Sequence, residues 1–176
     1  MAKLIKEEVK FDGPRFNVIR KTYEREDGKQ FLRDIVNPGE AAVILPITDK
    51  NEVVFETQVR ESVGKVCLEL PAGMVDKGEE PIDTAKRELE EETGLIANYI
   101  EHLITIYPST GYTSERVHIF LARDFENGHT HFDSTEEILD IVKIPIEECI
   151  EKAKNGELEN ASQVIAILLY SQKYMK

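Results

Sequence analysis

The most informative part of this 176-residue chain is the stretch GMVDKGEEPIDTAKRELEEETGL, residues 73–95. Pro81 suits the first position of a helix, where its missing N–H is not needed. Gly94 suits the position just past the last turn. The stretch therefore predicts a helix over roughly residues 82–92. It also has the pattern G-x5-E-x7-R-E-U-x-E-E-x-G-U, with U aliphatic, formed by Gly73, Glu79, Arg87, Glu88, Leu89, Glu91, Glu92, Gly94 and Leu95.

The predicted helix carries acidic residues beside its apolar side. At about 100° per residue, Ile82, Ala85 and Leu89 fall on one face, which we expect to pack into the core. Glu88 and Glu92 are one turn apart, so they lie one above the other beside that face. The helix therefore has an acidic edge next to the surface that docks on its neighbours.

Glu91 lies on the same flank, so like charges accumulate at this edge. Their mutual repulsion and their position near the helix C-terminus are both unfavourable. Arg87 can pair with Glu91, but one cation does not neutralise the group. A hard divalent cation would, and Mg²⁺ is the usual one where phosphate oxygens complete its octahedron. The alternative interpretation is a solvated acidic helix end.

The residues before the helix are expected to bring backbone carbonyls close to its acidic edge. Residues 68–73, LELPAG, are typical of a strand that ends in a tight loop. Pro71 cannot continue the ladder, and Gly73 allows a sharp turn. Glu69 alternates with its leucine neighbours and so points to the opposite face from them. It is either a substrate or metal contact or an ordinary exposed strand residue.

The spaced motif resembles the signature of the Nudix hydrolases, which cleave nucleoside diphosphates linked to another group. Two further runs are similar to the family branch that hydrolyses ADP-ribose, in addition to residues 68–73: residues 58–60, QVR, and residues 107–116, YPSTGYTSER. The resemblance implies a Nudix-type α/β/α sandwich with a mixed β-sheet, in the α/β (α+β) class. The alternation of strands and helices along the chain supports the same class.

The resemblance also implies a set of metal ligands. These are Glu88, Glu92 and the backbone carbonyl of Ala72, with Glu91 sharing a second ion and so contributing to catalysis. The metal would be Mg²⁺, with Mn²⁺ as a substitute. Two cations would bridge the phosphate oxygens, polarise phosphorus and lower the pKa of a bound water.

Arginines are the candidates for holding the diphosphate. Arg60 ends a strand, and a guanidinium can hold a diphosphate through two parallel hydrogen bonds, which lysine cannot match. Arg33 and Arg116 are weaker candidates. The plainer interpretation of Arg60 is a solvated strand end, and Arg116 could instead pair with Glu115 or Glu137.

A general base is expected on the loop DSTEE, residues 133–137. In the branch that this chain resembles, an acidic residue on this loop activates the attacking water. Glu136 is the first candidate and Glu137 the second. The alternative is a charged surface loop, and Ser134 and Thr135 stand where the branch often has further acidic residues.

Composition sets broad limits on the class of protein. A hydrophobic content of 41% and a charged content of 32% are those of a soluble globular protein. A net charge of −12 argues against a general nucleic-acid or anionic-membrane surface. Cys67 and Cys149 are expected to be buried apolar residues in a reducing cytosol. No signal peptide or membrane span is evident, so we expect a cytoplasmic protein.

The remaining elements follow from periodicity and turn residues. We expect strands over residues 16–23, 29–36, 41–46, 52–60, 68–70, 99–107, 116–122 and 138–144, and helices over residues 146–154 and 162–174. Ser162 is expected to cap the last helix. Residues 1–38 are assigned to an N-terminal β extension that, in the branch resembled, helps form a homodimer. Residues 39–176 form the Nudix domain.

The leading functional hypothesis is therefore Mg²⁺-dependent hydrolysis of ADP-ribose to AMP and ribose 5-phosphate. A first alternative is hydrolysis of another nucleoside diphosphate sugar or a dinucleotide. A second is a nucleotide-sensing module that keeps the fold without catalysis. Such a module should lack part of the catalytic set or carry a DNA-binding domain, whereas this chain keeps every glutamate of the motif.

Overall fold

The computed structural model describes residues 2–130 and 138–175, which form two compact units. The larger unit contains residues 41–106 and 117–176, and the smaller contains residues 1–40 and 107–116. The elements in chain order are β1 (Lys3–Asp12), β2 (Asn17–Glu24), β3 (Gln30–Asn37), β4 (Glu40–Pro46), β5 (Glu52–Arg60), β6 (Lys65–Glu69), β7 (Ala72–Met74), α1 (Pro81–Thr93), β8 (Leu95–Ile106), β9 (Arg116–Asn127), β10 (Ile138–Pro145), α2 (Ile146–Lys154) and α3 (Ala161–Tyr174).

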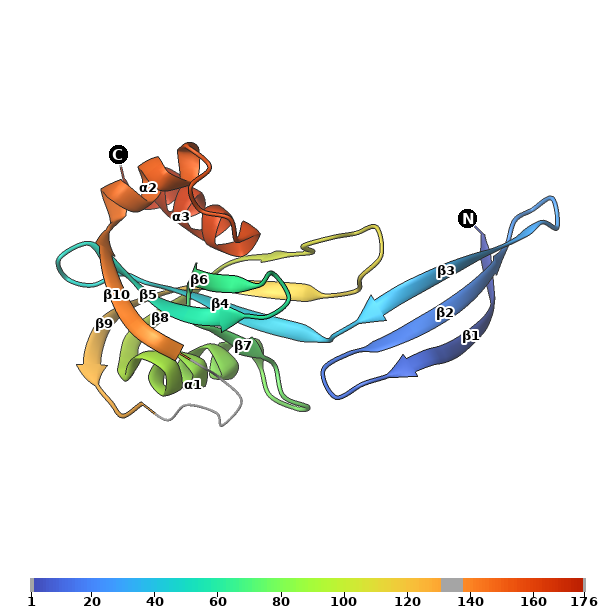
Figure 1. Cartoon of the computed structure of the whole chain (residues 1–176), viewed down its shortest axis with the longest axis horizontal. Helices are drawn as coiled ribbons and strands as arrows, with labels where there is room; N and C mark the ends of the chain where they lie inside the picture. Colours follow the sequence, from blue (N-terminus) through green and yellow to red (C-terminus); the bar gives the residue numbers. More distant parts are fainter. Residues whose placement is uncertain (1, 131–137, 176) are drawn as a thin grey trace. The chain divides into compact units, whose positions relative to one another are not determined.

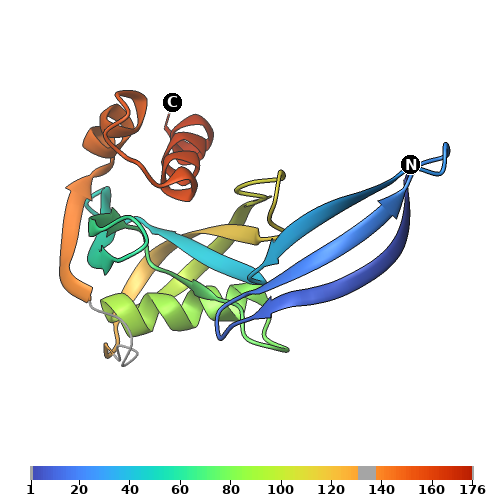
Figure 2. The same cartoon turned by 45° about the vertical axis from the view of Figure 1, so that its right-hand side comes forward.

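The larger unit is a sandwich of helices around strands. Its sheets have the orders β7-β4-β9-β8 and β10-β5-β6. Helix α1 covers one side of the strands, and α2 and α3 cover the other (Figures 1 and 2). The expected fold class, a Nudix-type sandwich, is thus confirmed.

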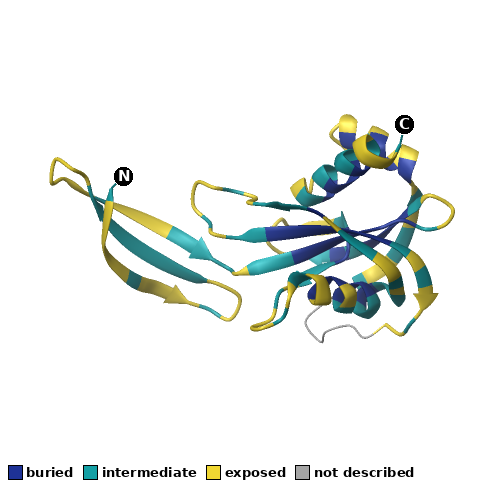
Figure 3. Cartoon of the chain, turned by 180° about the vertical axis from the view of Figure 1, so that it is seen from behind, coloured by how far each residue is buried: buried dark blue, intermediate teal, exposed yellow. Residues whose placement is uncertain are grey.

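The alternation of side chains along β4 explains why helices cover both sides. Val43 and Leu45 belong to the core cluster that includes residues of α2 and α3. Ala42 and Ile44 belong to the second cluster, which includes residues of α1. A strand that is apolar on both faces needs a layer on each, because each buried aliphatic side chain contributes about 1.5–3 kcal/mol. In Figure 3 the buried residues lie along these central strands and on the helix faces turned toward them.

Helix α1 forms where the sequence predicts it. Gly94 adopts the left-handed conformation with φ of 68° and donates to the carbonyl of Glu90, so the predicted stop is confirmed. Ala85 and Leu89 are fully buried, as expected. Ile82 is 36% exposed, so its assignment to the core was wrong. It lies in the first turn, one turn before the surface that contacts the strands.

Two other local predictions were wrong. Helix α3 is capped by Asn160, whose side chain accepts hydrogen bonds from the backbone N–H groups of Ser162 and Gln163. Ser162 therefore lies inside the first turn instead of capping it. Cys149 is buried as expected, but Cys67 is only partly buried because it lies on β6, at the edge of its sheet.

The smaller unit is an antiparallel sheet of order β1-β2-β3, joined by the 107–116 segment. Strand β1 was not predicted, because bulges between Leu4 and Lys6 and between Val9 and Phe11 break its period of two. The backbone of Val36 in β3 exchanges hydrogen bonds of 2.8 and 3.0 Å with Tyr112 and Ser114. None of the described residues of this unit is buried (Figure 3).

None of the described helices combines the length and apolar character that crossing a membrane requires.

Candidate active site

Two carboxylates of α1 lie against β7. Glu92 Oε2 accepts a hydrogen bond from the backbone N–H of Ala72 at 3.0 Å. Gly73 is so close to Glu88 that a Cβ on it would lie 1.8 Å from Glu88 Oε1. Both glutamates are nearly inaccessible, with 7% of Glu88 and 2% of Glu92 exposed. The structure therefore brings together the predicted ligands Ala72, Glu88 and Glu92.

Arg87 links the other acidic residues of the motif. Its Nη1 donates to Glu88 Oε1 at 2.7 Å and to Glu91 Oε2 at 3.0 Å, which confirms the expected pairing with Glu91. Its Nη2 donates to Glu79 Oε2 at 3.2 Å. The hydrogen bonds that it donates to Glu79 contribute most to raising the pKa of this guanidinium above its ordinary value. The guanidinium of Arg87 therefore fixes the positions of the carboxylates of Glu79, Glu88 and Glu91.

Glu79 holds Arg87 in place from the loop before α1. Hydrogen bonds from Arg87 and then from the Thr84 hydroxyl, at 2.7 Å, lower the pKa of Glu79 from 4.5 to about 2. Because the folded-state pKa is depressed, the charged form stabilises the fold above pH 4.5. That contribution is lost as the pH falls from 4.5 to about 2.

We expect Glu79→Gln to flatten the acid dependence of stability. The variant should be less stable than the wild type at neutral pH, and the difference should shrink as the pH falls from 4.5 to about 2. Urea unfolding at a series of pH values measures this difference in the free energy of unfolding. Glu61→Gln, which changes an exposed residue in a turn, is the control. A constant difference at all pH values would contradict the assignment of this charge to the network.

The donor set around residues 72–73 fits a hard divalent cation. All its members are oxygens, which Mg²⁺ prefers. Within residues 2–130 and 138–175, no three His, Cys, Asp or Glu side chains cluster in a way that could hold a metal alone.

The polar face of β5 and β6 forms a second part of the site. Residues directly opposite in an antiparallel pair share a face. The register places Glu56 opposite Glu69 and Gln58 opposite Cys67. Glu56 and Gln58 are almost fully buried, at 1% and 3% exposed, and were not among the predicted site residues. Their alternation as polar residues within the apolar run 53–59, VVFETQV, is the signal that could have indicated them.

Arg60 and Glu69 contact each other on this face. Arg60 Nε and Nη2 both donate to Glu69 Oε2, at 3.0 and 2.6 Å. Burial lowers the pKa of Arg60. The hydrogen bonds that Arg60 donates to Glu69, together with the negative charges of Glu69, Glu56 and Glu92, raise this pKa above its ordinary value. The charge of Glu92 on α1 thus acts on Arg60, which connects this face with the carboxylates at residues 72–73.

The other two predicted arginines belong to the smaller unit. Arg33 Nη1 donates to the carbonyl of Leu32 at 2.9 Å, and its guanidinium lies 4.8 Å from the centre of the Phe31 ring. Arg116 pairs with Glu40 at 2.8 Å. The predicted pairing of Arg116 with Glu115 is not found, because the guanidinium of Arg116 donates to Glu40 on the neighbouring strand instead.

The base candidates Glu136 and Glu137 lie outside the described residues. The described residues on either side of them belong to the larger unit. On one side, the N–H of Gly128 donates to the carbonyl of Gly94 at the end of α1, at 2.8 Å. On the other, Ile138 of β10 lies opposite Gln58 of β5.

Comparison with known proteins agrees with this geometry. The NUDIX domain matches residues 37–165. The ADP-ribose pyrophosphatase of Bacillus subtilis is 32% identical over 94% of this chain and 90% of its own length. The chain belongs to the Nudix family, as the resemblance of its motif implied, and it is a Nudix hydrolase.

Two further comparisons are informative. The methanol dehydrogenase activator of Bacillus methanolicus is also 32% identical, over 94% of this chain and 90% of its own length. A crystal structure of an ADP compounds hydrolase has the same fold, with a TM-score of 0.86, 23% identity, and coverage of 97% of this chain and 92% of the other. Relatives of equal similarity thus carry names that refer to different activities.

Proposed function

We propose that the protein hydrolyses the diphosphate bond of ADP-ribose, giving AMP and ribose 5-phosphate, with Mg²⁺ as the cofactor and Mn²⁺ as a substitute. The observation that carries this proposal is the convergence of Glu88 and Glu92 on residues 72–73. The relatives named ADP-ribose pyrophosphatase, in Bacillus subtilis and, at 30% identity, in Mycobacterium tuberculosis, support the choice of substrate.

Glu88, Glu92 and the carbonyl of Ala72 would hold the metal, and Glu91 would share a second ion. Bound Mg²⁺ supplies Lewis-acid polarisation of the diphosphate and a bound water of lowered pKa. Arg87 positions Glu88 and Glu91 through the hydrogen bonds described above. These carboxylates are therefore already oriented for the cation before the substrate binds.

Arg60 would orient the diphosphate. In this structure its donors are directed at Glu69, and a diphosphate oxygen offers the same kind of acceptor. Glu136, or Glu137 in its place, would accept the proton from the attacking water. Arg33 and Arg116 remain candidates for the substrate's outer groups.

A substrate panel tests the proposal. ADP-ribose, GDP- and UDP-sugars and dinucleotides are each incubated with Mg²⁺, and the products are separated by chromatography. We expect AMP to be released fastest from ADP-ribose. Preference for a GDP- or UDP-sugar would overturn the substrate while leaving the class of reaction intact.

The relative named methanol dehydrogenase activator supports a second candidate, activation of a partner dehydrogenase. Addition of a methanol dehydrogenase with its cofactor to the same panel distinguishes the two candidates, because only the second predicts a change in the dehydrogenase's turnover.

We further propose that the N-terminal extension, residues 1–38, forms a homodimer. Its sheet exposes large apolar side chains. A three-stranded sheet in which none of the described residues, 2–38, is buried needs a partner surface. The exposed residues include Leu4, Ile5, Val9, Phe11 and Leu32, at 43%, 44%, 62%, 50% and 52%.

Sedimentation velocity should therefore show a dimer for the wild type. Val9→Lys adds a charge to this surface and should shift the protein toward monomer. Glu26→Gln, which changes the charge by the same amount in the exposed β2–β3 turn, should leave the dimer intact. A wild type that sediments as a monomer at all accessible concentrations would refute the proposal.

A further inference from the structure

Glu56 of β5 is a buried carboxylate that the proposed mechanism does not use. Only 1% of this residue is exposed. Glutamate is almost never fully buried unless its charge is paired, because a buried charge without compensation is strongly destabilising. The reason for a carboxylate at this position therefore lies in the groups that surround it.

Glu56 shares one face of the β5–β6 pair with Arg60 and Glu69. Val53 and Phe55 of β5 pack into the cluster that includes residues of α2 and α3. Because side chains alternate along a strand, Glu56 and Arg60 point to the opposite face, which is the one on the α1 side. Glu69 lies directly opposite Glu56 in the register of the two strands, so its side chain is on that face as well.

Arg60 reaches along this face toward the two carboxylates. It lies opposite Lys65, four residues along β6 from Glu69, yet its Nε and Nη2 both donate to Glu69 Oε2, at 3.0 and 2.6 Å. The guanidinium therefore extends back along the strands toward the level of the Glu56–Glu69 pair. Two carboxylates directly opposite each other repel, and a cation on the same face offsets that repulsion. The charge of Glu56, after that of Glu69, contributes to raising the pKa of Arg60 above its ordinary value.

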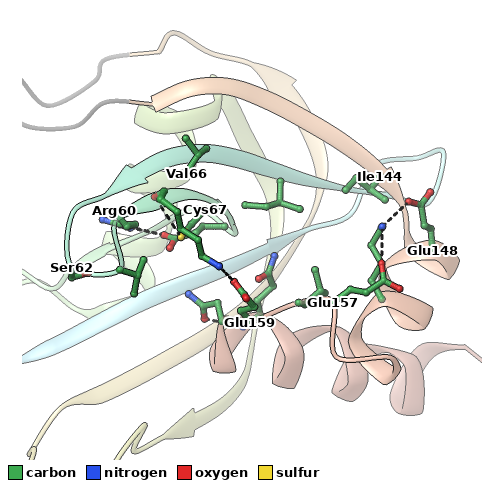
Figure 4. A pocket seen from close by; sticks show the side chains of 16 residues that line it. Arg60, Ser62, Val66, Cys67, Ile144, Glu148, Glu157 and Glu159 are labelled. Carbon is green, nitrogen blue, oxygen red and sulfur yellow. Dashed lines mark hydrogen bonds and ion pairs between the residues drawn. The ribbon is translucent and has the colours of Figure 1, made fainter.

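The two carboxylates differ in how easily a ligand can reach them. A cavity of about 970 Å³ lies between β6 and the helices α2 and α3, and its lining includes Arg60 and Glu69 (Figure 4). Glu56 is not among the described residues that line it. The side chain of Arg60 is 35% exposed, so a diphosphate can reach its donors and replace Glu69 as their acceptor. Glu56, in contrast, stays buried beside them.

We propose that Glu56 is a positioning residue, which holds the guanidinium of Arg60 on this face once a diphosphate has replaced Glu69. Glu56 acts through its charge and does not touch the substrate. Its own position is fixed by burial, and a supporting group of this kind keeps a binding residue in its productive geometry. The inference rests on the role proposed above for Arg60 in binding the diphosphate.

Calorimetric titration with α,β-methylene-ADP, a diphosphate analogue with a methylene bridge, in the presence of Mg²⁺ tests the inference. Glu56→Gln keeps the shape of the side chain, removes its charge and should weaken binding by roughly tenfold, within the range of couplings between interacting residues. A carboxylate that only added negative charge near the diphosphate would give the opposite sign, because its removal would tighten the binding of an anion. Glu52→Gln, which removes the same charge at the start of the same strand, should leave the Kd unchanged.

Two further variants separate the inference from the role of Arg60 itself. Arg60→Gln should weaken binding of the same probe, and Glu56→Gln should cause little further loss in that background, because Glu56 acts through Arg60. A general disturbance of the fold would instead weaken binding in both backgrounds. Glu69→Gln removes the exchangeable partner and should bind the probe at least as tightly as the wild type, since Glu56 still holds the guanidinium.

The possible failures can be told apart. Unchanged binding by Arg60→Gln would remove the proposed role of Arg60 and this inference with it. If Arg60→Gln weakens binding, then unchanged or tighter binding by Glu56→Gln, or additive losses in the double variant, would overturn the inference alone. If Glu56→Gln does not fold, Glu69→Gln decides, because a loss as large as that of Arg60→Gln would mean that Glu69 alone positions the guanidinium.

Discussion

Replacing Glu92 by glutamine should lower kcat for ADP-ribose hydrolysis by roughly a thousandfold or more, because metal-ion stabilisation of the transition state supplies several kcal/mol. The fold should persist. Glutamine keeps an oxygen that can accept the 3.0 Å hydrogen bond from the N–H of Ala72. The substitution also removes one of two like charges one turn apart, so stability without divalent cations should not fall.

Glu90→Gln is the matched control, because it removes the same charge from α1 at a position that contacts neither Ala72 nor Arg87 in the described structure. Its kcat should stay within a few-fold of the wild type. Thermal unfolding gives an independent measurement, since Mg²⁺ should raise the Tm of the wild type and of Glu90→Gln but not of Glu92→Gln. Near-normal turnover of Glu92→Gln at saturating Mg²⁺ would show that the ligand assignment is wrong.

The part of the site that could be predicted from the sequence is the part encoded locally. Pro81, Gly94 and the apolar pair Ala85 and Leu89 define α1 within a few turns. Once the helix is defined, its periodicity places Glu88 and Glu92 on one edge. The fold class could be predicted because strands and helices alternate along the chain and are separated by clear turn residues.

The parts that could not be predicted depend on pairing between distant segments. The polar face that contains Glu56 and Gln58 exists only because β6 pairs with β5 in one register. The Arg116–Glu40 pair joins strands far apart in the sequence, and no local pattern indicates it. Strand β1 escaped prediction because its bulges interrupt the alternation on which strand prediction depends.

Cys67 illustrates the same limit at the level of one residue. Its apolar neighbours Val66 and Leu68 suggested a buried position. Burial, however, depends on whether another strand covers that side of β6, and β6 is an edge strand. The cavity beside it is formed by segments from β5 to α3, so it has no signature in any single stretch of sequence.

Gly73→Ala should produce a folded protein with a misplaced Glu88. The new Cβ would lie 1.8 Å from Glu88 Oε1, 2.1 Å from its Cδ and 2.7 Å from its Cγ, so the glutamate must move. The backbone at Gly73 is outside the left-handed region, and the clashing atoms are the far end of a flexible side chain. Helix α1 should therefore stay in place, held by the fully buried Ala85 and Leu89.

The expected effect of Gly73→Ala is a loss of about a hundredfold in kcat, the scale that a displacement of about 1 Å can produce at a catalytic group. Gly111→Ala is the control, because a Cβ there meets nothing within 4 Å. If Gly73 acts through the position of Glu88, Gly73→Ala should cause little further loss in a Glu88→Gln background. Additive losses in the double variant, or near-normal turnover of Gly73→Ala alone, would mean that the close contact between Gly73 and Glu88 does not set the position of a catalytic carboxylate.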